Sequence, residues 1–150
     1  MKYRIENILS NQDISDILEL KEHSLLTEFK EQYYNLFNTD YSHVNSHYHE
    51  FSMFKKICLD RTIKNHYVLV YREGSYCKIH QDDKKSAKTI VTMLDRSEDL
   101  IGGECIFYDG VVPYVCDLQI GESVIYDQNM FHGVSMVQRG FRTVLVSWFL

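Results

Sequence analysis

His80 and Asp82 are the residues whose types and spacing could bind a metal ion. In an extended strand, side chains two residues apart leave the same face, so the imidazole and the carboxylate would point together. One nitrogen and one oxygen do not complete a coordination shell, and a third ligand must come from a neighbouring strand. His132 is the candidate. Two histidines and one carboxylate suit non-heme Fe(II) with open positions, so these three residues are the predicted metal ligands and catalytic residues.

Two alternatives to this ligand set are visible in the sequence. Asp83 could replace Asp82, but on a continuing strand it would point to the opposite face. His43, His47 and His49 form a second histidine cluster, which lacks a carboxylate or thiolate in register and a pattern that would aim the rings at one point. We expect a solvated loop there, with a substrate-facing loop or adventitious metal binding as the alternatives.

Arg142 lies ten residues after His132, inside an apolar run. A buried charge without a partner is costly, so this guanidinium needs an anion. Its planar fork can hold a carboxylate with two parallel hydrogen bonds. The alternative is a surface arginine paired with a protein carboxylate.

These residues belong to an ordered set of motifs between residues 67 and 150. The set comprises Tyr71, Gly74, His80, Asp82, Gly102-Gly103-Glu104, Gly121, His132-Gly133-Val134, Gly140-Phe141-Arg142 and Trp148-Phe149. In this order it resembles the 2-oxoglutarate and Fe(II)-dependent dioxygenases, in particular the prolyl 4-hydroxylase-like branch. One departure is Met136, where the branch usually carries a proline, at a position that packs rather than reacts.

The resemblance implies a double-stranded β-helix (jelly roll) with helices supporting one sheet. It also implies Fe(II) at His80, Asp82 and His132, with 2-oxoglutarate as cosubstrate and dioxygen as oxidant, and it leaves open a requirement for ascorbate. Arg142 would anchor the distal carboxylate of 2-oxoglutarate, and Tyr71 would hydrogen-bond the cosubstrate or serve as a core tyrosine. The implied reaction hydroxylates an unactivated C–H bond while 2-oxoglutarate is decarboxylated to succinate and CO2. The retained Asp82 favours hydroxylation over halogenation.

The substrate and two other protein classes stay open. A peptidyl-prolyl group is the first expectation for the substrate, followed by a small molecule. A non-catalytic jelly-roll binding module is one alternative, although it would not need both the ligands and Arg142. A cupin-type metal protein without 2-oxoglutarate is the other, although it would be expected to show His-x-His with a nearby glutamate.

Short β-branched or aromatic runs between turn signals predict about eight strands after residue 67. Six runs are clear, at 67–71, 88–94, 104–108, 114–120, 123–126 and 142–149, and two shorter ones lie near 76–80 and 132–137. Asp109-Gly110 between two of them is a hairpin signal. This number of strands also fits a jelly roll. Ile90, Tyr126 and Trp148 are candidates to line the pocket.

Residues 1 to 65 read as a helical buttress for a jelly-roll core of about 66–150, within one domain. Capping residues at 10–13 precede an apolar stripe at helical spacing, and similar stripes follow at 25–37 and about 50–59. The lysines Lys84, Lys85 and Lys88 follow the predicted ligand pair. We expect a solvated charged turn there, with attraction of an acidic substrate or a phosphate as the alternative.

Charge and composition narrow the partners. The net charge of −5 and pI of about 5.8 argue against binding nucleic acid through phosphate neutralisation. No run is long and apolar enough for a membrane span, and the N-terminus lacks a signal-peptide core, so a cytoplasmic protein is expected. The four scattered cysteines form no Cys-x-x-Cys pair and are expected to be reduced and mostly buried. The oligomeric state is left open.

Overall fold

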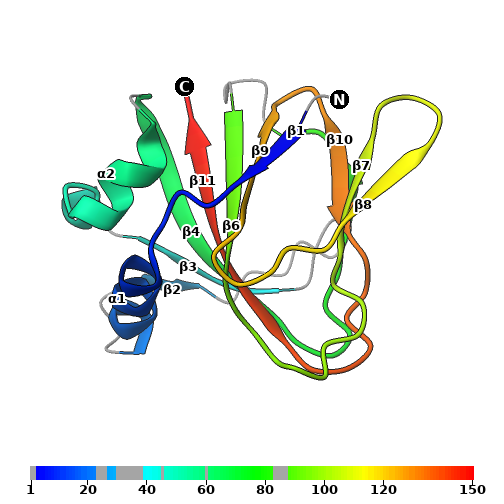
Figure 1. The fold of residues 1–150 in the computed structure, drawn as a ribbon, viewed down its shortest axis with the longest axis horizontal. Helices are drawn as coiled ribbons and strands as arrows, with labels where there is room; N and C mark the ends of the chain where they lie inside the picture. The colour runs from blue at the N-terminus through cyan, green and yellow to red at the C-terminus, as the bar shows by residue number, and fades with distance from the viewer. Residues whose placement is uncertain (1–2, 23–26, 30–38, 45, 60, 83–87) are drawn as a thin grey trace.

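The computed structural model describes residues 3–22, 27–29, 39–44, 46–59, 61–82 and 88–150. Strands dominate these residues and form two sheets that face each other (Figure 1). The elements are β1 (Tyr3–Glu6), α1 (Asn11–Glu22), β2 (Thr27–Phe29), β3 (Asp40–His43), a 3-10 turn η1 (Ser46–Tyr48), α2 (Ser52–Cys58), β4 (Ile63–Tyr71), β5 (Cys77–His80), β6 (Lys88–Arg96), β7 (Cys105–Tyr108), β8 (Pro113–Cys116), β9 (Ser123–Asp127), β10 (Phe131–Val134) and β11 (Arg142–Phe149).

The larger sheet has seven strands in the order β1-β9-β6-β11-β4-β3-β2. Its central strand β11 pairs antiparallel with β4 on one side and β6 on the other. Successive side chains of a strand alternate between the two faces, and both faces of β11 are covered. Val144 and Val146 pack between the two sheets, whereas Leu145 and Phe149 pack against the helices. This double burial explains why the strand reads as a continuous apolar run.

The two helices cover the outer face of the larger sheet (Figure 1). The first begins with a reciprocal cap, in which the backbone N–H of Asp13 donates to Ser10 Oγ at 3.1 Å and that of Ser10 donates to Asp13 Oδ2 at 2.9 Å. Lys56 of α2 reaches the same carboxylate at 2.8 Å, which ties the helices together. The predicted cap at 10–13, the helix that follows it and the helix at about 50–59 are therefore confirmed.

The smaller sheet has the order β5-β10-β7-β8 and forms the second layer. The hairpin predicted at Asp109-Gly110 joins β7 to β8, and Gly110 has the positive φ of 116° that such a turn requires. All eight strands expected after residue 67 are present. The second apolar cluster of the core lies between the two sheets and includes Met93, Phe107 and Val144.

The N-terminal part differs from the expectation of helices alone. It contributes strands β1, β2 and β3 to the larger sheet. A helix was expected at 25–37, but residues 27–29 form β2, which pairs with β3. The other residues of that expected helix lie outside the described residues. His43 lies in β3 rather than in a loop. These short strands exist because each has a neighbour to pair with, and pairing overrides local preference. No helix in the described residues is long and apolar enough to cross a membrane.

Candidate metal centre

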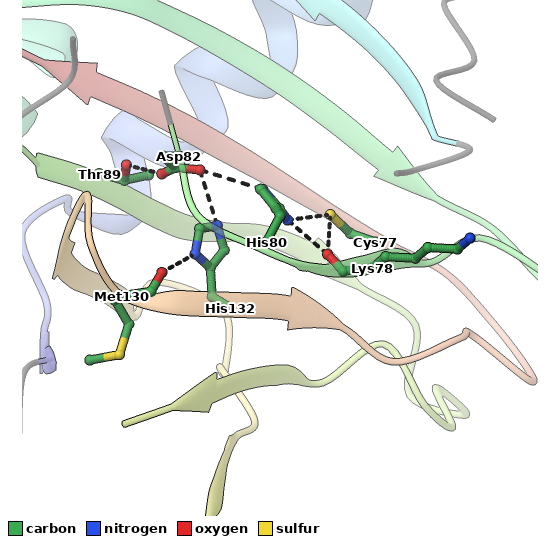
Figure 2. A network of polar contacts seen from close by, with 7 residues as sticks. All are labelled: Cys77, Lys78, His80, Asp82, Thr89, Met130 and His132. Atoms are coloured by element: carbon green, nitrogen blue, oxygen red, sulfur yellow. Dashed lines mark hydrogen bonds and ion pairs between the residues drawn. The ribbon is translucent and has the colours of Figure 1, made fainter. Parts of the chain in front are cut away.

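His80, Asp82 and His132 converge at one end of the space between the sheets. His80 is the last residue of β5, and His132 lies opposite it on β10 in the antiparallel register. Asp82 follows two residues after β5 ends. Its Oδ1 atom lies 3.1 Å from Nε2 of His132 and 3.5 Å from Nε2 of His80 (Figure 2). One donor atom from each residue lies within 4.8 Å of the others, a spacing that a metal ion could bridge.

Backbone carbonyls set the orientation of both imidazoles. Nδ1 of His80 lies 2.7 Å from the carbonyl oxygen of Lys78, and Nδ1 of His132 lies 2.9 Å from that of Met130 (Figure 2). A carbonyl can only accept, so each Nδ1 must carry the hydrogen. Each Nε2 then has a lone pair available for a metal when the ring is neutral, and it is this atom that faces Asp82.

The charges of the cluster suit a cation. Burial raises the pKa of Asp82, but hydrogen bonds from the two histidines outweigh it and hold that pKa well below its usual range. Burial also lowers the pKa of His80, and its hydrogen bonds to Asp82 and Cys77 outweigh this and raise the pKa to about 10. The carboxylate is therefore ionised at neutral pH, and a metal ion at Nε2 would displace a proton from His80.

A cavity of about 340 Å³ connects the ligand cluster with Arg142 and Tyr71. Arg142 is only 1% exposed, and its guanidinium carbon lies 4.8 Å from the centre of the Tyr71 ring. Its Nη2 contacts Cys105 Sγ at 3.7 Å, whereas Nε and Nη1 have no hydrogen-bond partner. No ion pair joins Arg142 to a carboxylate in the described part of the chain. Burial raises the pKa of Tyr71, so its phenol is neutral.

The remaining lining is apolar and partly as expected. Tyr126 and Trp148 line the cavity, but Ile90 does not, and that prediction is wrong. Ile90 packs in the cluster under the helices, and its neighbour Val91 lines the cavity instead. A shift of one residue along a strand moves a side chain to the other face, and the sequence did not determine which alternate residues of this strand face the cavity.

The other chemically interesting side chains lie away from the cluster or outside the described residues. His43 packs against Tyr67 with ring centres 4.3 Å apart, and His49 lies against His66. Asp83, Lys84, Lys85 and the side chain of His47 are outside the described residues. Lys88 pairs with Asp127 at 3.0 Å.

Thr89 is a further residue at the cluster, and it is not among the site residues predicted from the sequence. Its hydroxyl donates to Asp82 Oδ2, and the residue is fully buried. Thr89 precedes Val91 and Met93 at two-residue steps on the inner face of β6. A hydroxyl on an otherwise apolar face needs a hydrogen-bond partner, and this was the available signal.

Comparison with known proteins places the fold. No protein-family model and no curated protein matches the sequence. Among solved structures, an oxidoreductase of the 2OG-Fe(II) oxygenase family from Burkholderia pseudomallei is similar, with a TM-score of 0.79 and 14% identity over 99% of this chain and 84% of that one.

Two prolyl hydroxylases are also similar in structure. The prolyl-4-hydroxylase of Pseudomonas putida has a TM-score of 0.73 at 15% identity, over 99% of this chain and 91% of that one. The viral collagen prolyl hydroxylase of Paramecium Bursaria Chlorella virus-1, solved as a 2OG complex, has a TM-score of 0.74 at 15% identity, over 99% and 95%. The chain therefore has the double-stranded β-helix fold of the 2OG-Fe(II) oxygenases, as the motifs implied.

Proposed function

We propose that this protein is an Fe(II)- and 2-oxoglutarate-dependent dioxygenase that hydroxylates an unactivated C–H bond. The observation that carries the proposal is the buried, unpaired guanidinium of Arg142 in the same cavity as His80, Asp82 and His132. The three predicted metal ligands alone do not explain a nearby arginine, and a buried arginine needs an anion to pair with its charge. A ligand that carries a carboxylate and also chelates a metal answers both requirements.

The donor set fits the metal. Two neutral imidazole nitrogens and one carboxylate oxygen on one side of a cation are the arrangement of non-heme Fe(II) sites with open positions. Bound iron would supply activation of dioxygen coupled to oxidative decarboxylation of 2-oxoglutarate to succinate and CO2. The two carbonyls that accept from Nδ1 keep each Nε2 aimed at the shared position.

Arg142 and Tyr71 are proposed to hold the cosubstrate. The guanidinium atoms Nε and Nη1 are buried donors without a partner, and an incoming carboxylate can accept from them. The Tyr71 ring beside the guanidinium limits its movement and stabilises its charge. The buried apolar walls exclude water from this end of the cavity, which strengthens the pairing of opposite charges.

The lining of the cavity also bears on the substrate. Apart from Arg142 and the three proposed ligands, the lining has no charged side chain among the described residues. A charged group would be buried there without a partner, so the reacting part of the substrate is expected to be uncharged. A prolyl ring in a peptide meets this condition, and the likeness to two prolyl hydroxylases supports it as the first candidate. An uncharged small molecule is the second.

An anaerobic titration of the Fe(II)-loaded protein with 2-oxoglutarate tests the proposal without knowledge of the substrate. Chelation of the metal by 2-oxoglutarate gives a weak visible charge-transfer band. We expect the band in the wild-type protein and its loss in Asp82→Ala, with the fold of the variant checked by circular dichroism. Iron binding without the band would favour a metal protein that does not use 2-oxoglutarate. Absence of iron binding would leave a non-catalytic jelly roll.

A further inference from the structure

The Thr89 hydroxyl is a fully buried polar group beside the proposed metal ligands. It donates to Oδ2 of Asp82, whose side chain is only 4% exposed (Figure 2). Asp82 follows the end of β5 in the smaller sheet, whereas Thr89 lies on β6 in the larger one. The hydrogen bond therefore connects the two layers at the ligand cluster.

The two oxygens of Asp82 have different partners. Oδ1 faces Nε2 of His132 at 3.1 Å and Nε2 of His80 at 3.5 Å, whereas Oδ2 accepts from Thr89. The carboxylate is thus oriented with one oxygen toward the proposed metal position and the other turned to the protein. A carboxylate without such a hydrogen bond can bind a metal through one oxygen or through both.

Thr89 is itself held firmly. It pairs with Tyr126 of β9 on one side and with Trp148 of β11 on the other, so its backbone lies inside the sheet. The adjacent Lys88 forms an ion pair with Asp127 at 3.0 Å. A β-branched side chain has a restricted χ1 angle, so the hydroxyl has little freedom to leave Asp82.

The number of oxygens that Asp82 gives to a metal decides how many positions stay open. On a six-coordinate metal, two histidines and one carboxylate oxygen would leave three positions, enough for a two-atom chelator and dioxygen. If Asp82 gave both oxygens, only two positions would remain, and the chelator would take them. We propose that Thr89 is a positioning residue that keeps Asp82 a one-oxygen ligand and so preserves the position that dioxygen needs.

The consequence for dioxygen rests on the proposed function, whereas the consequence for metal binding does not. The first measurement is therefore the affinity for Co(II) alone, by calorimetry, in the wild type, Thr89→Ser, Thr89→Cys and Thr89→Val. Serine keeps the hydroxyl, the thiol of cysteine is a weak donor, and valine keeps the shape without a donor. We expect affinity close to wild type for serine. Valine should lose about 10- to 100-fold, because a carboxylate that Thr89 no longer holds must be ordered when the metal binds, and cysteine should give an intermediate loss.

Thr92→Val is the matched control. Thr92 lies on the same strand, is equally buried, and hydrogen-bonds Ser123 at 2.6 Å on the helix side of the sheet. Its replacement removes a buried hydroxyl bond without touching Asp82, so it should lower stability but leave Co(II) affinity unchanged. If Thr89→Val does not fold, the serine and cysteine variants still decide the order. Equal Co(II) affinity in all folded Thr89 variants would overturn the proposal.

A second measurement counts the open positions. Nitric oxide serves as a stable probe for the dioxygen position, and its binding to the Fe(II) protein with saturating 2-oxoglutarate is followed by electron paramagnetic resonance. We expect binding in the wild type and Thr89→Ser, and its loss in Thr89→Val. Nitric oxide bound equally well in Thr89→Val would overturn the role in preserving that position.

The outcomes separate this inference from the proposed function. Weakened Co(II) binding in Thr89→Val, without any response of the wild type to 2-oxoglutarate, supports the positioning role and contradicts the dioxygenase. A normal 2-oxoglutarate response with no effect of Thr89→Val on either measurement does the reverse. A wild-type protein that binds no Co(II) contradicts both.

Discussion

The two faces of β11 and its neighbouring strands differ in the charge of the buried polar groups that lack a hydrogen-bond partner. On the helix side, Nδ1 of His66 pairs with Ser147 Oγ at 2.8 Å and Thr92 pairs with Ser123, whereas Nε2 of the uncharged His66 ring has no hydrogen-bond partner. On the cavity side, Arg142 keeps two donors without a partner. Buried polar groups that pair with one another support the fold, whereas a buried charge without a partner costs much more stability than a neutral atom and persists where a ligand needs it. We therefore infer that the helix face mainly supports stability, and the cavity face is the proposed ligand site.

The largest expected effect comes from the helix face. Leu145 is fully buried there, and Leu145→Ala should lower the free energy of unfolding by about 2 to 5 kcal/mol through the cavity that it leaves. The variant that remains folded should bind Co(II) and 2-oxoglutarate as the wild type does. Urea unfolding and metal titration check the two halves. A large loss of ligand affinity in the folded variant would contradict the division between the faces.

Arg142→Met tests the cavity face. Charged hydrogen bonds contribute about 1.5 to 3 kcal/mol each, so one such bond is worth about 10- to 150-fold in 2-oxoglutarate affinity, which should fall by at least this factor. Stability should be unchanged or higher, because the substitution removes a buried charge that has no protein partner. Anaerobic titration and urea unfolding measure the two quantities, and Co(II) affinity is the control. A strongly destabilised variant with normal 2-oxoglutarate affinity would reverse the assignment.

His66 gives the helix face a pH dependence. Burial, together with His49, lowers the pKa of His66 to about 3, so the folded state keeps a neutral ring while the unfolded state gains a proton below its ordinary pKa. Stability from this group is therefore present above about pH 6.5 and is lost as the pH falls toward 3, by up to about 1.4 kcal/mol per pH unit. The difference in unfolding free energy between the wild type and His66→Asn isolates this slope. Parallel pH profiles would contradict it.

The smallest effect is expected at the contact between the helices. Lys56→Met removes the ion pair with Asp13, where Lys56 is half exposed, so the loss of stability should be at most about 1 kcal/mol. Burial raises the pKa of Asp13, but its hydrogen bonds to Lys56 and Ser10 outweigh this and hold that pKa below its ordinary value. The contribution is present above the ordinary pKa of Asp13 and disappears as the pH falls through the lowered one. Urea unfolding at pH 7 and at acidic pH measures it, with metal affinity expected to be unchanged.

The central strands and the ligand cluster could be predicted because their signals are local or repeated. Runs of β-branched residues indicate β6 and β11, and Asp109-Gly110 indicates the hairpin. The sequence also pointed to His80, Asp82 and His132 as one group, and the register of β5 against β10 places the two histidines opposite each other.

The features that could not be predicted depend on which strands pair and on which face of the sheet each side chain lies. Strands β1, β2 and β3 are three or four residues long and have no strong pattern of their own. The side of β6 on which Ile90 lies follows from its register with β9 and β11, which is a property of the assembled sheet. The role of Thr89 depends on where Asp82 comes to rest after β5 ends, and residue types alone do not determine that position.

The proposed ligands and the proposed anion anchor come from different layers. His80 and His132 belong to the four-stranded sheet, and Arg142 and Tyr71 belong to the seven-stranded one. If the proposed function holds, the distance between the sheets sets the length of dicarboxylate that fits, since that ligand would have to reach from the metal to the guanidinium. Packed sheets have a nearly constant spacing, set by the side chains between them. Selection among dicarboxylates of different chain length thus becomes a property of core residues such as Phe107, which need not touch the ligand's charged ends.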